Sequence, residues 1–248
     1  MKKKFTLKEI RAAGDDLNTL TKNFHPYPVL SPYISYFFVN YFPFTPNQIS
    51  ILWGIIGLIG AFFIAIGGYW YMLIGILIYH AGFILDCTDG ELARLKKKTS
   101  LGGAYLDKFL HQVHRSVLVL ALGIGVYNTS GHILYFYFGA FSSLFFMMDN
   151  IGKLKVYEVL ANKNKFWLAE KMQESYKKRG ESKNKILRIM KKYSLEMLRP
   201  ANPFTLLFFA ILFNVAKYYL ILMIIVTPIF FAKSFMNTYR ELGNLSEK

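Results

Sequence analysis

A short polar stretch interrupts an apolar run near residue 90. Asp86, Asp89, Gly90 and Ala93 stand at positions i, i+3, i+4 and i+7. On a helix this spacing puts two carboxylates and two minimal side chains on one face. Residues without bulk let a ligand approach the helix backbone at that face. Arg94 follows directly and is long enough to hold a carboxylate or a phosphate with two of its nitrogens.

A second polar face follows in the next apolar segment. Gly103, Asp107 and His111 stand four residues apart, so they share one side of a helix. The connection at residues 95–101 is short, so the two helices are expected to be antiparallel neighbours with converging polar faces. Ionisable groups in an apolar segment are costly unless they are paired or bound to a metal. A functional site is therefore the leading hypothesis.

The expected ligand of this site is a divalent cation. Three carboxylates in one cleft repel one another unless a cation neutralises them, and hard ions such as Mg²⁺ or Mn²⁺ match oxygen donors. One or two ions are expected, and they would bring phosphate oxygens with them. His114 lies one turn beyond His111 and is interpreted as a polar side chain bonded within the helix bundle, with a metal triad of Asp107, His111 and His114 as the alternative.

The spacing of these residues resembles the signature of the CDP-alcohol phosphotransferases, Asp-x2-Asp-Gly-x2-Ala-Arg-x8-Gly-x3-Asp-x3-Asp. Seven of the eight signature positions match between Asp86 and Asp107. The departure is His111, which stands where the signature ends in aspartate. The sequence Thr45-Pro46-Asn47 places a capping residue and an early proline at the head of a long apolar run, and this opening is also similar to that family.

The resemblance implies an integral membrane enzyme of phospholipid biosynthesis. Such an enzyme takes a CDP-linked alcohol such as CDP-diacylglycerol, transfers the substituted phosphate to a hydroxyl acceptor and releases CMP. The family's metal ligands correspond here to Asp86, Asp89 and Asp107. The positions that receive the CDP group correspond to Gly90, Ala93, Gly103 and Asn47. A homodimer and contact with membrane lipids are implied in the same way.

His111 inherits two roles from the aspartate of the signature, those of metal ligand and of the base that deprotonates the acceptor. A neutral imidazole accepts a proton near pH 7 and ligates borderline metals. It carries no negative charge, so a second Mg²⁺ is expected to bind less tightly and Mn²⁺ to be preferred. Together with the phosphate-binding Arg94 and the carboxylate of Asp107, His111 completes the set of predicted catalytic residues.

These residues are embedded in an apolar and basic chain. Of its 248 residues 54% are hydrophobic, and 30 Lys and Arg against 15 Asp and Glu give a net charge of +15. Apolar runs that approach or reach spanning length predict an all-α polytopic membrane protein. When the runs are threaded alternately through a bilayer, nearly all basic loops fall on one side, as cytoplasmic loops do. This pattern explains the charge without nucleic acid and predicts a cell-membrane protein whose site faces the cytoplasm.

About six transmembrane helices are predicted, preceded by an amphipathic interfacial helix within residues 5–24. Gly67-Gly68 leaves room for only a tight hairpin between the first two spans, and the last apolar block is expected to turn at residues 214–217. The predicted regions are an interfacial segment at 1–44, a transmembrane catalytic domain at 45–235 with a basic cytoplasmic insert at about 153–198, and a cytoplasmic tail at 236–248.

Two alternatives to phospholipid synthesis remain open. The same chemistry with a small CDP-linked alcohol would serve a glycan or an unusual headgroup, and donor specificity distinguishes the two. A catalytically weak family member would bind the nucleotide without releasing CMP. A transporter is disfavoured, because the carboxylates lie near the predicted membrane surface and transporter sites lie near the midplane.

Overall fold

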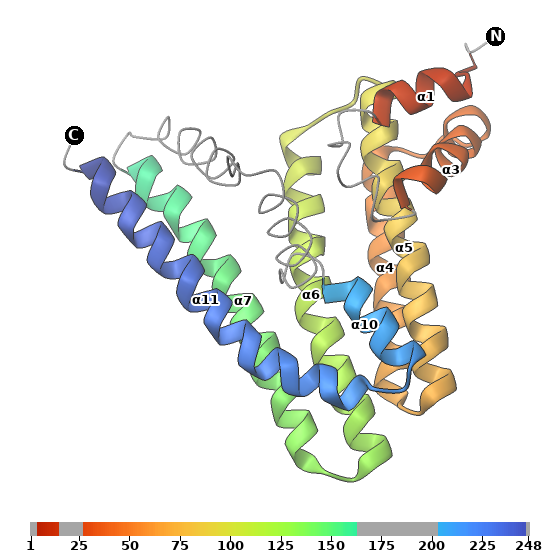
Figure 1. Cartoon of the computed structure of the whole chain (residues 1–248). Coiled ribbons are helices and arrows are strands. Elements are labelled where there is room, and N and C mark those ends of the chain that lie inside the picture. Colours follow the sequence, from red (N-terminus) through yellow and green to blue (C-terminus); the bar gives the residue numbers. More distant parts are fainter. Residues whose placement is uncertain (1–3, 15–26, 163–202, 247–248) are drawn as a thin grey trace, which may run out of the picture. The chain divides into compact units, whose positions relative to one another are not determined.

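The computed structural model describes residues 4–14, 27–162 and 203–246, and every regular element in those ranges is an α-helix (Figure 1). The prediction of an all-α protein is confirmed for this part of the chain. The chain divides into two compact units, Met1–Leu118 and Val119–Lys248. The first unit contains all the residues of the predicted site.

Within the described ranges, four helices are long and apolar enough to cross a membrane. They are α4 (Pro46–Ile66), α5 (Tyr69–Leu95), α6 (Leu101–Ser130) and α11 (Ala216–Ser246). In addition, α7 (Ile133–Asn162) contains the shorter apolar stretch Ile133–Asp149. A bilayer accepts helices of this kind because each satisfies its own backbone hydrogen bonds. The chain is an integral membrane protein.

The last apolar block forms two helices, as predicted. α10 (Pro203–Leu212) is followed by a turn in which Asn214 has φ 57°, and α11 begins at Ala216. The ten residues of α10 measure about 15 Å, half the thickness of a hydrocarbon core. The described ranges thus hold four full-length candidate spans and the shorter stretch of α7, where the sequence predicted six spans.

α4 starts at a capping box and ends in a hairpin. The Thr45 hydroxyl accepts a hydrogen bond from the backbone N–H of Gln48 at 3.3 Å, and the Gln48 side chain accepts one from the Thr45 N–H at 2.8 Å. Pro46 occupies the first turn, where its missing N–H costs nothing. Gly67 and Gly68 have φ 87° and 81° and turn the chain directly into α5. The predicted tight hairpin is confirmed.

The two helices of this hairpin approach closely where Gly60 faces Gly75. A Cβ added at Gly75 would lie 2.6 Å from the carbonyl oxygen of Gly60 and 2.8 Å from the backbone nitrogen of Ile64. Small residues let membrane helices pack with their backbones in contact. The hairpin is the framework that carries Asp86 and Asp89 on α5.

Two short helices lie beside the end of α5 that carries the signature residues (Figure 1). They are α1 (Leu7–Gly14) and α3 (Tyr27–Tyr41). α1 is the described part of the predicted amphipathic helix, whose residues 15–24 lie outside the described ranges. Both helices contact α5, so they help to fix the position of its last turns.

α3 binds to α5 through its polar side. Ser31 and Ser35 are completely buried and donate hydrogen bonds of 2.6 and 2.5 Å to the Glu91 carboxylate. The Tyr27 hydroxyl bonds to Nδ1 of His80, and burial raises the pKa of Tyr27. The outer face of α3 exposes large apolar side chains, as suits a membrane interface. They are Val29, Leu30, Tyr33, Phe37 and Tyr41.

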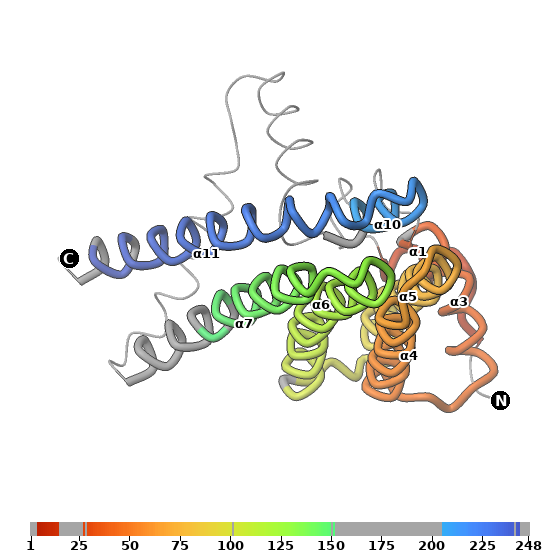
Figure 2. The backbone as a smooth tube through the Cα atoms, turned by 90° about the horizontal axis from the view of Figure 1, so that it is seen from below, coloured from red at the N-terminus to blue at the C-terminus, as the bar shows by residue number. Residues whose placement is uncertain are grey.

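In the second unit α7 and α11 pack along each other (Figure 2). The rings of Phe145 and Phe231 meet between them, with centroids 5.8 Å apart. The part of α6 in this unit contacts α7 through glycine, since a Cβ added at Gly123 would lie 2.8 Å from Cα of Gly139. Of the predicted basic insert, residues 163–198 lie outside the described ranges.

Candidate active site

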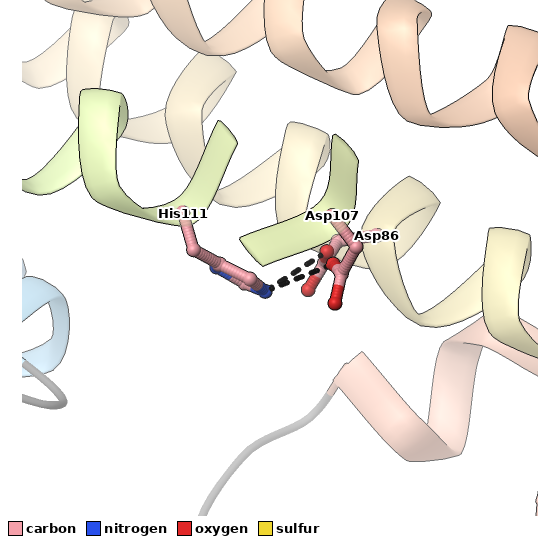
Figure 3. Close-up of side chains that lie close together, drawn as sticks. All are labelled: Asp86, Asp107 and His111. Carbon is pink, nitrogen blue, oxygen red and sulfur yellow. Dashed lines mark ion pairs between the residues drawn. The ribbon is translucent and has the colours of Figure 1, made fainter. Parts of the chain in front are cut away.

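α5 and α6 bring an imidazole against two carboxylates (Figure 3). Nε2 of His111 lies 3.3 Å from Oδ1 of Asp86 and 3.3 Å from Oδ1 of Asp107. Asp107 and His111 stand on successive turns of α6, whereas Asp86 reaches across from α5. The structure therefore brings together three of the four predicted metal ligands.

The donor atoms of this cluster suit a divalent cation. One ligand atom from each of the three residues lies within 4.8 Å of the others. Two carboxylates and one imidazole are donors that a divalent ion such as Mg²⁺ or Mn²⁺ accepts. The side chains are 14% exposed for Asp86, 29% for His111 and 42% for Asp107. The cluster thus opens at Asp107, where substrate oxygens could complete the coordination.

Asp89, the fourth predicted ligand, has a different partner. Its buried carboxylate accepts a hydrogen bond of 2.5 Å at Oδ2 from the Ser50 hydroxyl of α4. Asp89 is not among the three residues whose donor atoms converge. The sequence analysis missed Ser50. A signal for it exists, because Ser50 stands three residues after Asn47 and the two share one face of α4.

For the reaction that the sequence resemblance implies, replacing Ser50 by Ala is expected to lower CMP release about tenfold, because the Asp89 carboxylate loses the hydrogen bond that orients it. Steady-state kinetics in detergent measure the loss. Thr227→Ala is the matched control, since it removes a buried hydroxyl that donates to the Met223 carbonyl of its own helix. An equal loss in both variants would show that Ser50 matters only for helix packing.

The small signature residues lie at one end of the first unit. A Cβ added at Gly103 would lie 2.9 Å from Oδ1 of Asn47, so the starts of α4 and α6 meet there. A Cβ at Gly90 would lie 3.4 Å from the Arg94 guanidinium, which is an ordinary contact. Ala93 is half-buried. The residues predicted to receive the CDP group thus belong to the starts of α4 and α6 and the last turns of α5.

Arg94 is turned toward α1. Its Nε donates a hydrogen bond to the backbone carbonyl of Ala13. Next to it, Glu91 packs against Gly14, where an added Cβ would lie 3.1 Å from Oε1. Arg94 therefore holds α1 against α5. The guanidinium has further N–H donors that a phosphate can engage. Its catalytic role stays a prediction.

His114 lies inside the helix packing, as expected from the sequence. It is completely buried, and its ring centroid lies 4.6 Å from that of Trp53 and 5.6 Å from that of Tyr79. It also makes a hydrogen bond to the backbone of Gly54. A Cβ added at Gly57 would collide with its ring, so glycine is needed at that position. His114 does not join the three converging residues.

The helices and the site define the class of the protein. It is an all-α membrane protein in which two neighbouring spans present carboxylates and an imidazole to one another. Residues 44–232 match the family model described as CDP-alcohol phosphatidyltransferase. This match covers most of the sequence, and the chain belongs to that family.

The chain is also similar to the bifunctional IPC transferase and DIPP synthase of Aquifex aeolicus (strain VF5). The two are 32% identical over 109 residues. This similarity covers 44% of the present chain and 23% of the relative, so the chain matches less than a quarter of that protein. The two activities in its name belong to a much longer protein.

Proposed function

We propose that this protein transfers a substituted phosphate group from a CDP-linked alcohol to a hydroxyl acceptor and releases CMP. The observation that carries the proposal is the convergence of Asp86, Asp107 and His111 in a chain of the CDP-alcohol phosphatidyltransferase family. CDP-diacylglycerol is the proposed donor. The reaction then belongs to phospholipid biosynthesis.

Asp86 and Asp107, with His111 as a third donor, would hold the metal ion. A bound Mg²⁺ or Mn²⁺ supplies charge neutralisation at the phosphate oxygens. Asp89 is proposed as a ligand of a second ion, with its carboxylate oriented by the Ser50 hydroxyl. The half-buried setting of the carboxylates supports this assignment, because solvent then screens their repulsion incompletely.

His111 is the proposed base. Its Nε2 has one lone pair, so it takes the proton of the acceptor hydroxyl only while it is not bonded to the ion, whose ligands are then Asp86 and Asp107. The acceptor oxygen forms a bond to the β-phosphorus, and the bond from that phosphorus to the bridging oxygen of CMP breaks. The carboxylates of Asp86 and Asp107, each 3.3 Å from Nε2, stabilise the imidazole once it is protonated. Arg94 is proposed to bind phosphate through its terminal nitrogens.

The orientation of the site is proposed from the charges around it. The end of α5 and the connection after it carry four basic residues, Arg94, Lys96, Lys97 and Lys98. Such residues are retained on the cytoplasmic side of a cell membrane. The proposed transmembrane catalytic domain comprises residues 45–235, and its site faces the cytoplasm. A homodimer in contact with membrane lipids is proposed from the family resemblance.

A small CDP-linked alcohol is the second candidate donor. The family description names phosphatidyl transfer, whereas the name of the Aquifex aeolicus relative, an IPC transferase and DIPP synthase, does not. A donor of this kind would serve a glycan or an unusual headgroup. The chemistry at the β-phosphorus would be the same with either donor.

CMP release by the purified protein tests the proposal. CDP-diacylglycerol and a panel of small CDP-alcohols are compared with Mg²⁺, with Mn²⁺ and with a chelator as the metal-free control. Release that needs an ion and one donor supports the function and selects the donor. Stabilisation by CDP without CMP release from any donor would contradict it and indicate a nucleotide-binding member without transferase activity.

Replacing His111 by Asp restores the family signature. The variant is expected to release CMP and to raise the ratio of Mg²⁺ to Mn²⁺ activity by roughly tenfold, because a carboxylate is a harder donor and adds a negative charge. The ratio of kcat/KM with the two ions measures this shift. His132→Asp, at a histidine outside the site, is the control and should leave the ratio unchanged. Complete loss of activity in the first variant would show that the imidazole has a role that aspartate cannot take.

A further inference from the structure

The indole of Trp53 on α4 packs against the imidazole of His111. Its side chain is 1% exposed, and its ring centroid lies 5.2 Å from that of His111, 4.6 Å from that of His114 and 6.0 Å from that of Phe83. The ring of His111 also packs against Phe83, at 6.1 Å. The His111 imidazole therefore contacts apolar rings while its Nε2 faces the carboxylates.

An imidazole needs packed neighbours to hold its ring in one orientation, because its own torsional preference is weak. The outer side-chain torsion of histidine has broad minima, and turning the ring moves its nitrogens. In the observed orientation Nε2 lies 3.3 Å from both Asp86 and Asp107. The aspartate of the family signature has two equivalent oxygens and no ring to orient. A histidine at this position therefore depends on its neighbours for its ring orientation, whereas an aspartate does not.

The packing around Trp53 keeps it against His111. His114 contacts the indole and is itself bonded to the backbone of Gly54. Gly57 gives His114 the room to lie there, because a Cβ at that position would collide with the ring. The indole is thus held in a closely packed interior and cannot shift without displacing a second buried ring.

We propose that Trp53 is a positioning residue for His111, and that its indole keeps Nε2 of the imidazole turned toward Asp86 and Asp107. The inference rests on the proposed function, since it concerns the site assigned there to the metal ion. Trp53 acts through His111 and not through direct contact with the donor or the acceptor. It sets the geometry in which three donor atoms converge.

The test compares two substitutions of similar volume. Trp53→Phe keeps a ring against His111, whereas Trp53→Met removes the ring and fills the space with a flexible chain. Both are made in the full-length protein, in the native background and in the His111→Asp background. Mn²⁺ affinity is measured by electron paramagnetic resonance of the free ion, without donor or acceptor. Trp53→Leu is the second ring-free variant if methionine prevents folding.

In the native background the ring-free variants are expected to bind Mn²⁺ about 3- to 10-fold more weakly than Trp53→Phe. In the His111→Asp background all of them are expected to bind equally, within about twofold, because no imidazole remains to be oriented. Thermal unfolding in the same detergent measures the packing cost, which should be similar in both backgrounds.

Two results would overturn the inference. One is equal Mn²⁺ affinity of the Phe and Met variants in the native background, which would show that the ring is dispensable. The other is the same difference between them in both backgrounds, which would show a general effect on helix packing. Absence of Mn²⁺ binding by the unsubstituted protein is a separate outcome, because it contradicts the metal site of the proposed function itself.

Discussion

Replacing Asp107 by Asn is expected to lower CMP release at least about 100-fold. The amide keeps the shape of the side chain and removes the negative charge that faces both His111 and the opening of the site. A divalent cation then loses one of two carboxylate donors, and the protonated imidazole loses one of two stabilising partners. Asp86→Asn is expected to have the same effect. Initial rates at saturating Mn²⁺ and donor measure the loss.

The matched control for this prediction is Asp149→Asn on α7. It removes the same charge from a residue that lies outside the three converging side chains, and it should retain nearly all activity. Both variants should also unfold at nearly the native temperature, which separates loss of chemistry from loss of fold. Turnover near the native rate in Asp107→Asn would remove this residue from the metal site.

Gly75→Ala is expected to destabilise the first unit by about 2 to 3 kcal/mol. The added methyl group would lie 2.6 Å from the carbonyl oxygen of Gly60 and 2.8 Å from the backbone of Ile64. Backbone atoms cannot rotate out of the way as a flexible side chain can, so α4 and α5 must separate. Unfolding of the purified protein in detergent, followed by circular dichroism, measures the change.

Gly102→Ala is the control for the packing prediction. The same methyl group at Gly102 would meet nothing within 4 Å, so only the helix propensity of α6 changes, and in the favourable direction. Its stability should equal or slightly exceed that of the native protein. Equal stability of Gly75→Ala and Gly102→Ala would show that the contact between Gly60 and Gly75 relaxes without cost.

Local sequence rules predicted the elements that depend on neighbouring residues. The cap at Thr45 and the hairpin at Gly67 and Gly68 each follow from residues that are adjacent in the chain. The turn at Asn214 between α10 and α11 was likewise predicted within the last apolar block.

The polar face of each site helix could be predicted, whereas the partner of each side chain could not. A spacing of four puts Asp107 and His111 on one side of α6, and the structure keeps them together. Asp89 shares a face with Asp86, yet it bonds to Ser50 on another helix. Arg94 likewise finds Ala13 of α1. The hydrogen-bond partner of each side chain depends on which helices become neighbours, and the spacing of residues along one helix does not contain this information.

α4 carries none of the acidic signature residues, yet its register along α5 and α6 determines three contacts of the site. Within two turns it places Asn47 beside Gly103, Ser50 on Asp89 and Trp53 against His111. Further along the same helix, the contact between Gly60 and Gly75 fixes the axial position of α4 relative to α5. The three contacts are thus mechanically linked, and an axial slide of α4 would alter the nucleotide end, the buried carboxylate and the imidazole together. A substitution that disturbs the contact between Gly60 and Gly75 would therefore change all three contacts of the site together.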